Sequence, residues 1–188
     1  MKRILIVVGA VMFLLAGVVN LWAFDGNRKG FILGGGLGLG LTSFIFDSDF
    51  GSSSDRENKF SFMTDLKIGY APTEQVEIYY SSKVSWFSVG DGDAVIFAYG
   101  FGSAAISYYF QPQSPTFYVS GGLGVATLSD PFEDDPETSS GFGLFAGGGY
   151  EFARHYAVEF DLMYGLPKDQ GITFKGFVPR LVFVATAF

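Results

Sequence analysis

Hydrophobic residues alternate with small or polar residues along most of the chain, and a period of two is typical of β-strands. In the segment Gly30–Thr42, Phe31 and Leu33 begin an apolar face, while glycines occupy most of the opposite face. The same pattern predicts eight strands, over residues 30–42, 59–71, 76–86, 94–110, 117–126, 141–151, 156–164 and 172–188. In the fourth of them, Phe97, Tyr99 and Phe101 begin on the apolar face, and an apparent change of phase near Ser103–Ala105 predicts a β-bulge.

The connections between these strands are alternately long and short. The short ones are Pro72–Gln75, Gln111–Pro115 and Ala153–His155, and the long ones include Asp47–Asn58 and the acidic Ser129–Ser139. This order is typical of an antiparallel up-and-down barrel with both chain ends on one side. The final segment, Ile172–Phe188, is rich in β-branched and aromatic residues and would be a bare apolar edge in an open sheet. We therefore expect it to pair with Gly30–Thr42 and close the barrel.

The composition of the two strand faces indicates which one is outside. The face opposite the large apolar residues is mostly glycine, alanine and serine, which is too few charges for a solvated surface but suits the narrow interior of an eight-stranded barrel. The sequence thus predicts a transmembrane barrel with an apolar exterior, and a soluble lipocalin-like barrel is the alternative. Aromatic residues near the strand ends predict two interfacial girdles, formed by Tyr70, Tyr108, Tyr109, Phe110, Tyr150, Phe152 and Tyr156 at one end and by Phe60, Trp86, Phe87, Phe142 and Tyr164 at the other.

Several charged residues fall on the small-residue face, which we expect to line the lumen. They are Asp65, Lys67, Glu77, Lys83, Glu151, Glu159 and Asp161. Buried charges must pair, so we expect an ion-pair network in which the two lysines meet carboxylates among Glu77, Glu159 and Asp161. Such a network would plug the lumen.

Two lysines do not balance five carboxylates, and Arg180 is the remaining candidate cation. If Phe188 points outward, strict alternation carries Arg180 outward as well, into lipid, at a cost of about 2–4 kcal/mol near the midplane. A bulge at Pro179 would reconcile the two positions, because proline cannot donate a hydrogen bond to the ladder.

The N-terminus indicates export. Lys2 and Arg3 precede the apolar segment Ile4–Val19, and Leu21–Ala23 offers a cleavage site, so residues 1–23 are predicted to be a signal peptide and residues 24–188 the barrel domain. The chain has no cysteine and carries 12 Lys and Arg against 19 Asp and Glu. This acidic balance disfavours a nucleic-acid partner, and we expect no cofactor.

With its leader, alternating strands, short turns and terminal Phe188, the chain resembles the small eight-stranded outer-membrane β-barrels of the OmpA/OmpX type. The resemblance implies an outer-membrane protein in contact with lipid and lipopolysaccharide, and we expect it to be a monomer. It also implies that Phe188 belongs to a C-terminal signal read by the barrel-assembly machinery. Members of this group are structural, adhesive or host-interacting proteins, and a few are lipid-modifying enzymes.

The candidates for chemistry are few. His155 is the single histidine, and a hydrolase would need a nucleophile and an orienting acid beside it. Its position in a short turn argues against that role, so we expect no catalytic and no metal residues. The acidic segments Asp47–Gly51 and Asp130–Glu137 could bind Ca²⁺ through carboxylates, although solvation is the simpler explanation. The glycines of Gly34–Gly40 lack the lysine of a phosphate-binding loop.

Our expectation is therefore a non-enzymatic outer-membrane barrel with a structural or surface-interaction role. The alternatives are a small porin-like channel for solutes and a lipid-modifying outer-membrane enzyme.

Overall fold

The computed structural model describes residues 26–48, 51–52, 56–90, 95–133, 136–169 and 172–188, so the predicted signal peptide lies outside the described residues. No helix in these ranges is long and apolar enough to cross a membrane. The strands are β1 (Gly30–Ser48), β2 (Gly51–Ser52), β3 (Glu57–Thr73), β4 (Val76–Val89), β5 (Val95–Tyr109), β6 (Thr116–Ser129), β7 (Thr138–Ala153), β8 (Tyr156–Asp169) and β9 (Ile172–Ala187).

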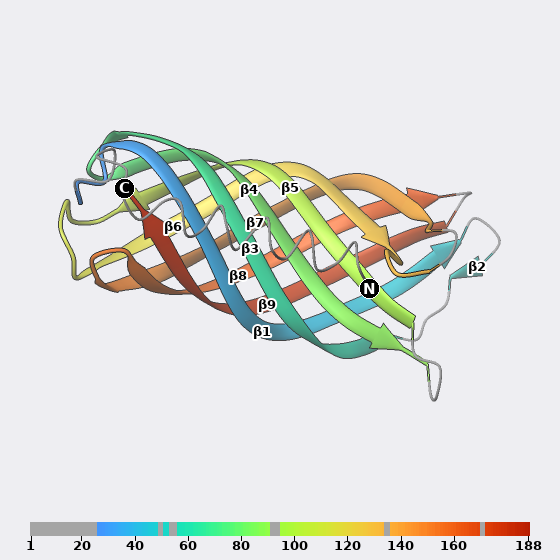
Figure 1. Cartoon of the computed structure of the whole chain (residues 1–188). Coiled ribbons are helices and arrows are strands. Elements are labelled where there is room, and N and C mark those ends of the chain that lie inside the picture. The colour runs from blue at the N-terminus through green and yellow to red at the C-terminus, as the bar shows by residue number, and fades with distance from the viewer. Residues whose placement is uncertain (1–25, 49–50, 53–55, 91–94, 134–135, 170–171) are drawn as a thin grey trace.

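Eight of these strands form one closed antiparallel barrel. Each long strand pairs with the next in sequence, and β9 pairs with β1 from Ser48↔Ile172 to Leu33↔Ala187. Figure 1 shows β9 lying beside β1, with the short turns at one end of the barrel and the β4–β5, β6–β7 and β8–β9 connections at the other. These ends are called the short-turn end and the loop end below. The predicted architecture and its closure are confirmed.

The strands are longer than the alternation predicted. β1 continues to Ser48, and the two-residue strand β2 pairs with its last two residues, so part of the predicted loop Asp47–Asn58 is strand. The predicted bulge near Ser103–Ala105 is wrong, because β5 keeps one register with β4 from Val76↔Tyr108 to Val89↔Val95. Phe97, Tyr99 and Phe101 simply face the lumen, like the polar residues that follow them on β5.

The exterior is apolar and the lumen contains the small and charged residues. Phe62 and Val158 are 46% and 41% exposed on the barrel wall, whereas Glu159, the next residue after Val158, is 6% exposed. A soluble barrel would show the opposite arrangement, so this wall belongs in a lipid bilayer. Two residues expected in the outer girdles, Phe87 and Tyr109, are instead buried in the lumen.

The last strand needs no bulge. Arg180 and Phe188 are 0% and 3% exposed, so both side chains point inward with the same parity. The register of β9 with β1 is the same on both sides of Pro179, from Ser43↔Phe177 to Gly40↔Arg180. The premise that Phe188 points outward is therefore wrong, and with it the expected bulge at Pro179.

Small residues form an arc across one side of the lumen wall. The register places Ser103, Gly124, Gly143, Gly165 and Gly176 side by side on the five strands from β5 to β9. A Cβ atom at Gly143 would lie 2.6 Å from the Phe101 ring, and one at Gly176 would lie 2.8 Å from the Tyr99 hydroxyl. This small-residue arc therefore makes room for the large rings of Tyr99 and Phe101, which extend into the lumen from β5.

Candidate functional site

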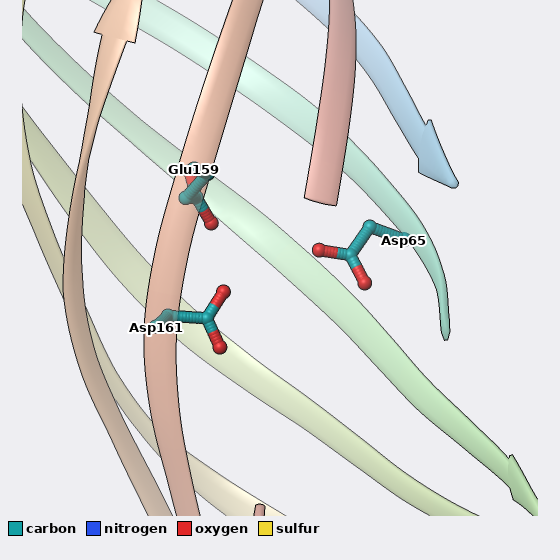
Figure 2. A group of neighbouring side chains, drawn as sticks. All are labelled: Asp65, Glu159 and Asp161. Atoms are coloured by element: carbon teal, nitrogen blue, oxygen red, sulfur yellow. The ribbon is translucent and has the colours of Figure 1, made fainter. Parts of the chain in front are cut away.

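Lys83 is the centre of the charge network in the lumen. Its Nζ lies 2.9 Å from Asp65 Oδ2, 2.8 Å from Glu159 Oε1 and 2.9 Å from Asp161 Oδ2. Alternation produces this meeting, because it points Lys83 inward from β4, Asp65 inward from β3, and both acids inward from β8. Figure 2 shows the three carboxylates directed toward one another from these strands.

Arg180 supplies the second cation of this cluster. Its guanidinium donates to Asp65 Oδ1, and its Nη1 lies 3.6 Å from Asp161 Oδ1. The carboxylate oxygens of Asp65, Glu159 and Asp161 are close enough together to hold a metal ion. However, the Lys83 ammonium already contacts all three, so a cation of the protein itself occupies that position.

A second group of polar contacts lies nearer the short-turn end. Lys67 Nζ lies 3.0 Å from Glu77 Oε2, and the Tyr109 hydroxyl donates to Glu77 Oε1 at 3.2 Å. The Tyr118 hydroxyl donates to Glu159 Oε2 at 2.8 Å, which connects this group to the Lys83 cluster. Neutral phenols thus provide hydrogen bonds that buried carboxylates need in addition to their ion pairs.

Arg28 is a lumen cation that the sequence reasoning missed. It precedes β1, yet its side chain is buried at the short-turn end, where Nη2 lies 2.8 Å from Glu151 Oε1. Its guanidinium also donates to the carbonyl oxygens of Glu74 and Pro112 and lies 3.9 Å from the centre of the Tyr109 ring. No strand periodicity includes position 28, so alternation could not identify it.

Phe188 lies beside Arg28 in the same mouth of the barrel. The guanidinium is 5.6 Å from the centre of the Phe188 ring, and the His155 ring lies 4.6 Å from it on centroids. Gly26 N donates to the Phe188 carbonyl at 3.1 Å. A pocket of about 390 Å³ remains outside this contact, lined by Arg28, Glu74, Ser114 and Arg154 among others.

His155 has structural contacts in this region. Its Nδ1 lies 2.8 Å from the Thr186 carbonyl oxygen, and the Thr186 N–H donates to the His155 carbonyl at 2.9 Å. These bonds hold the β7–β8 turn against β9, and they bring no serine or threonine hydroxyl to the imidazole among the described residues.

The loop half of the lumen is filled by aromatic rings. The rings form a chain of contacts across the lumen, with centroid distances of 6.0 Å for Phe97–Phe87, 5.8 Å for Phe87–Phe44, 4.9 Å for Phe44–Phe174 and 5.2 Å for Phe174–Tyr99. The Tyr99 hydroxyl is buried without a hydrogen-bond partner among the described residues. Below this aromatic layer, Phe145 contacts both Phe101 and the Lys83 ammonium.

Little free space remains beside the charge network. A cavity of about 20 Å³ lies between Lys67, Lys83, Tyr79 and Glu159. That volume is about enough for one water molecule.

The loop segments considered for Ca²⁺ offer no assembled ligand set in the described residues. Asp47 and Ser48 belong to β1, and residues 49–50 lie outside the described ranges. In the second segment, Asp130 Oδ1 accepts the Glu137 N–H at 2.7 Å, which is a turn contact. Gly34–Gly40 lies within β1 and is not a loop.

The closed barrel, its apolar wall and its charged lumen define the fold as that of the small eight-stranded outer-membrane β-barrels. The crystal structure of Neisserial surface protein A (NspA) is similar at 16% identity, covering 85% of this chain and 97% of that one, with a TM-score of 0.54. At this identity the likeness shows the fold alone.

Two further structures are similar at lower scores. They are Ail of Yersinia pestis in complex with sucrose octasulfate (10% identity, 83% of this chain, 99% of that one, TM-score 0.47) and AlkL in lipid bilayers (11%, 86%, 92%, 0.49). No protein-family model and no curated protein sequence matches the chain.

Proposed function

We propose that this protein is a non-enzymatic outer-membrane barrel whose lumen is plugged by its own side chains. In this proposal it anchors its loops at the cell surface, with the short turns in the periplasm, and serves a structural or surface-interaction role. The observation that supports it best is the Lys83 ammonium bonded to three carboxylates from β3 and β8, because these contacts connect opposite parts of the wall through the middle of the lumen.

The charges of this network nearly balance. Four buried cations (Arg28, Lys67, Lys83 and Arg180) meet five buried or nearly buried acids (Asp65, Glu77, Glu151, Glu159 and Asp161). A solute would have to separate several of these pairs to pass, and removing one partner of a buried pair typically costs about 3–5 kcal/mol. This cost supports a plug rather than a pore.

Planar-bilayer recording with the purified protein tests the plug. We expect no steady channel current from the natural sequence. Because aromatic rings fill the loop half, an open path requires that both layers be reduced. A variant that does so should conduct, provided that its heat-modified mobility on gels shows a folded barrel; its substitutions are Lys83→Ala, Arg180→Ala, Asp65→Ala, Glu159→Ala and Asp161→Ala in the cluster, and Phe44→Ala, Phe87→Ala and Phe174→Ala in the aromatic layer. Large, steady current from the natural protein would contradict the proposal and favour the porin-like alternative.

The partners in this proposal are lipid, lipopolysaccharide and the assembly machinery. The apolar wall supports lipid contact, and a monomer is sufficient because β1 and β9 close the sheet within one chain. The Phe188 ring is enclosed by Arg28 and His155 once the barrel has formed, so it would have to be read by the assembly machinery before closure. Comparing assembly in cells with refolding into detergent for Phe188→Ala separates recognition from stability. If Phe188 serves only as a recognition signal, the variant should assemble poorly in cells but refold normally in detergent.

A lipid-modifying enzyme is the least supported alternative. It would require His155 to act at the short-turn end, where its partners are a backbone carbonyl and the Phe188 ring. Lipase and acyltransferase assays on His155→Ala and the natural protein would reveal any such activity.

A further inference from the structure

The β6–β7 connection contains a turn that folds back onto the outer wall of the barrel. Phe132 lies with its ring centroid 6.2 Å from that of Trp86 on β4, although the turn leaves the barrel from β6. The strand register places Trp86 two strands away from the start of this turn. Trp86 pairs with Ala98 on β5, and Ala98 pairs with Ser129, the last residue of β6. Phe132 therefore reaches across β5, and the outward-facing Ala98 is only 7% exposed.

Hydrogen bonds fix both partners of this contact. The Asp130 carbonyl accepts the Glu133 N–H at 3.1 Å, and its side chain accepts the Glu137 N–H. On the wall, Trp86 Nε1 donates to Thr64 Oγ1 at 2.9 Å. Hydrogen bonds therefore hold both the turn that carries Phe132 and the indole of Trp86 in place.

The contact between Phe132 and Trp86 lies at the edge of the apolar wall nearest the loop end. Trp86 pairs with Phe62 on β3, and Phe60 is the next outward-facing residue of β3 toward the loops. From Phe60 down to Tyr70, a tilted strand rising about 3.3 Å per residue spans roughly 25 Å, the height of the lipid-facing band of such barrels. Phe132 is 58% exposed at this edge, as the single aromatic residue of the acidic segment Ser129–Ser139.

We propose that Phe132 and Trp86 form a wedge that inserts into the boundary between head groups and acyl chains of the outer leaflet. The proposal rests on the lipid-embedded barrel proposed above and adds a site to it. Aromatic rings favour this boundary, and the contact with Trp86 joins Phe132 to the apolar wall. The acidic turn beside it stays in the head-group layer, and the wedge holds this loop down against the membrane.

Tryptophan fluorescence in lipid vesicles tests the wedge, because Trp22 and Trp86 are the two tryptophans of the chain. In the first variant, Trp22→Phe leaves Trp86 as the sole indole whether or not the leader is retained. In the second, Trp22→Phe, Trp86→Phe and Phe132→Trp move the indole to the turn. Each is reconstituted with phospholipid brominated near the head of the acyl chain, and aqueous iodide is used as the opposing quencher.

We expect brominated lipid to quench the indole at position 132 strongly and iodide to quench it weakly. The matched control moves the indole to the exposed Glu137 of the same connection by Glu137→Trp, where we expect the reverse. In the Trp86 variant, Phe132→Ser should increase quenching by iodide and shift the emission to longer wavelength. Unchanged heat-modified mobility would show that each variant is folded.

The other quenching results would contradict either the wedge or the lipid-embedded barrel. Quenching at position 132 by iodide alone would show the turn standing in water, and quenching by neither agent would show the ring covered by protein, a second copy included; both overturn the wedge. If brominated lipid fails to quench Trp86 itself, the barrel wall is not in lipid, and the proposed function fails instead.

Discussion

The two halves of the lumen are filled by different chemistry. In the short-turn half and the middle, Arg28, Lys67, Lys83 and Arg180 meet carboxylates, with phenols donating further hydrogen bonds. In the loop half, aromatic rings from β1, β4, β5 and β9 stack across the lumen. A charged interior depends on the presence of every partner, whereas an aromatic interior depends mainly on volume. The loss of folding free energy on mutation should therefore depend on charge pairing in one half of the lumen and on side-chain volume in the other.

The largest effect should come from Lys83→Met in the charged half. It leaves Asp65, Glu159 and Asp161 with one cation, Arg180, and we expect a loss of about 3–5 kcal/mol in folding free energy at neutral pH. Urea titration of the barrel in detergent micelles measures it. Because the cause is unpaired negative charge, the loss should shrink when acid protonates the carboxylates; a loss of the same size in acid would contradict the explanation.

Phe174→Ala should have the next largest effect, now in the aromatic half. It removes a ring that contacts both Phe44 and Tyr99, and cavity formation predicts a loss of about 3 kcal/mol. The same titration measures it. Phe174→Leu, which keeps most of the volume, should recover the larger part, and the loss should not depend on pH; a strong pH dependence would mean that the two halves are not separate.

Removing one tyrosine hydroxyl should have different effects on the folding free energy in the two halves. Tyr79→Phe removes a hydroxyl that lies 2.9 Å from Ser107 Oγ, and we expect a loss of about 1 kcal/mol. Tyr99→Phe removes a buried hydroxyl without a partner among the described residues, so we expect no loss or a gain of up to about 1 kcal/mol. Paired urea titrations decide; equal losses would show that Tyr99 has a partner after all.

The smallest effect should come from Lys59→Met. Lys59 Nζ lies 3.3 Å from Glu57 Oε2, and both side chains are partly exposed. Surface ion pairs of this kind contribute at most about 1 kcal/mol to the folding free energy. This substitution repeats the chemistry of Lys83→Met outside the lumen, so it serves as its control. A loss comparable to that of Lys83→Met would show that burial is not what makes Lys83 important.

Alternation predicted the barrel and most of the lumen charges, because a strand buries every second residue. It placed Asp65, Lys83, Glu159 and Asp161 on one face, and the structure brings these four side chains together. It did not predict the aromatic half. In β5, alternation predicts that Phe97, Tyr99 and Phe101 face lipid and needs a bulge to restore the phase, whereas the structure points these rings into the lumen.

The remaining misses have the same physical origin. Hydrophobicity distinguishes lipid from a charged lumen, but it cannot distinguish lipid from an aromatic lumen. Arg28 lies before the first strand, and its burial depends on contacts with Glu74, Pro112 and Glu151, which are distant in sequence. Arg180 was identified by charge balance, although the assumed direction of Phe188 was wrong.

The small-residue arc has an evolutionary consequence. Gly143, Gly165 and Gly176 have no side chains where Phe101 and Tyr99 are large, so neither group can change size alone without a clash or a hole. Substitutions on β7, β8 and β9 should therefore be inherited together with compensating ones on β5. In descendants that lost the Tyr99 ring, bulkier residues should appear at Gly165 or Gly176, because the space that the ring occupied is then free.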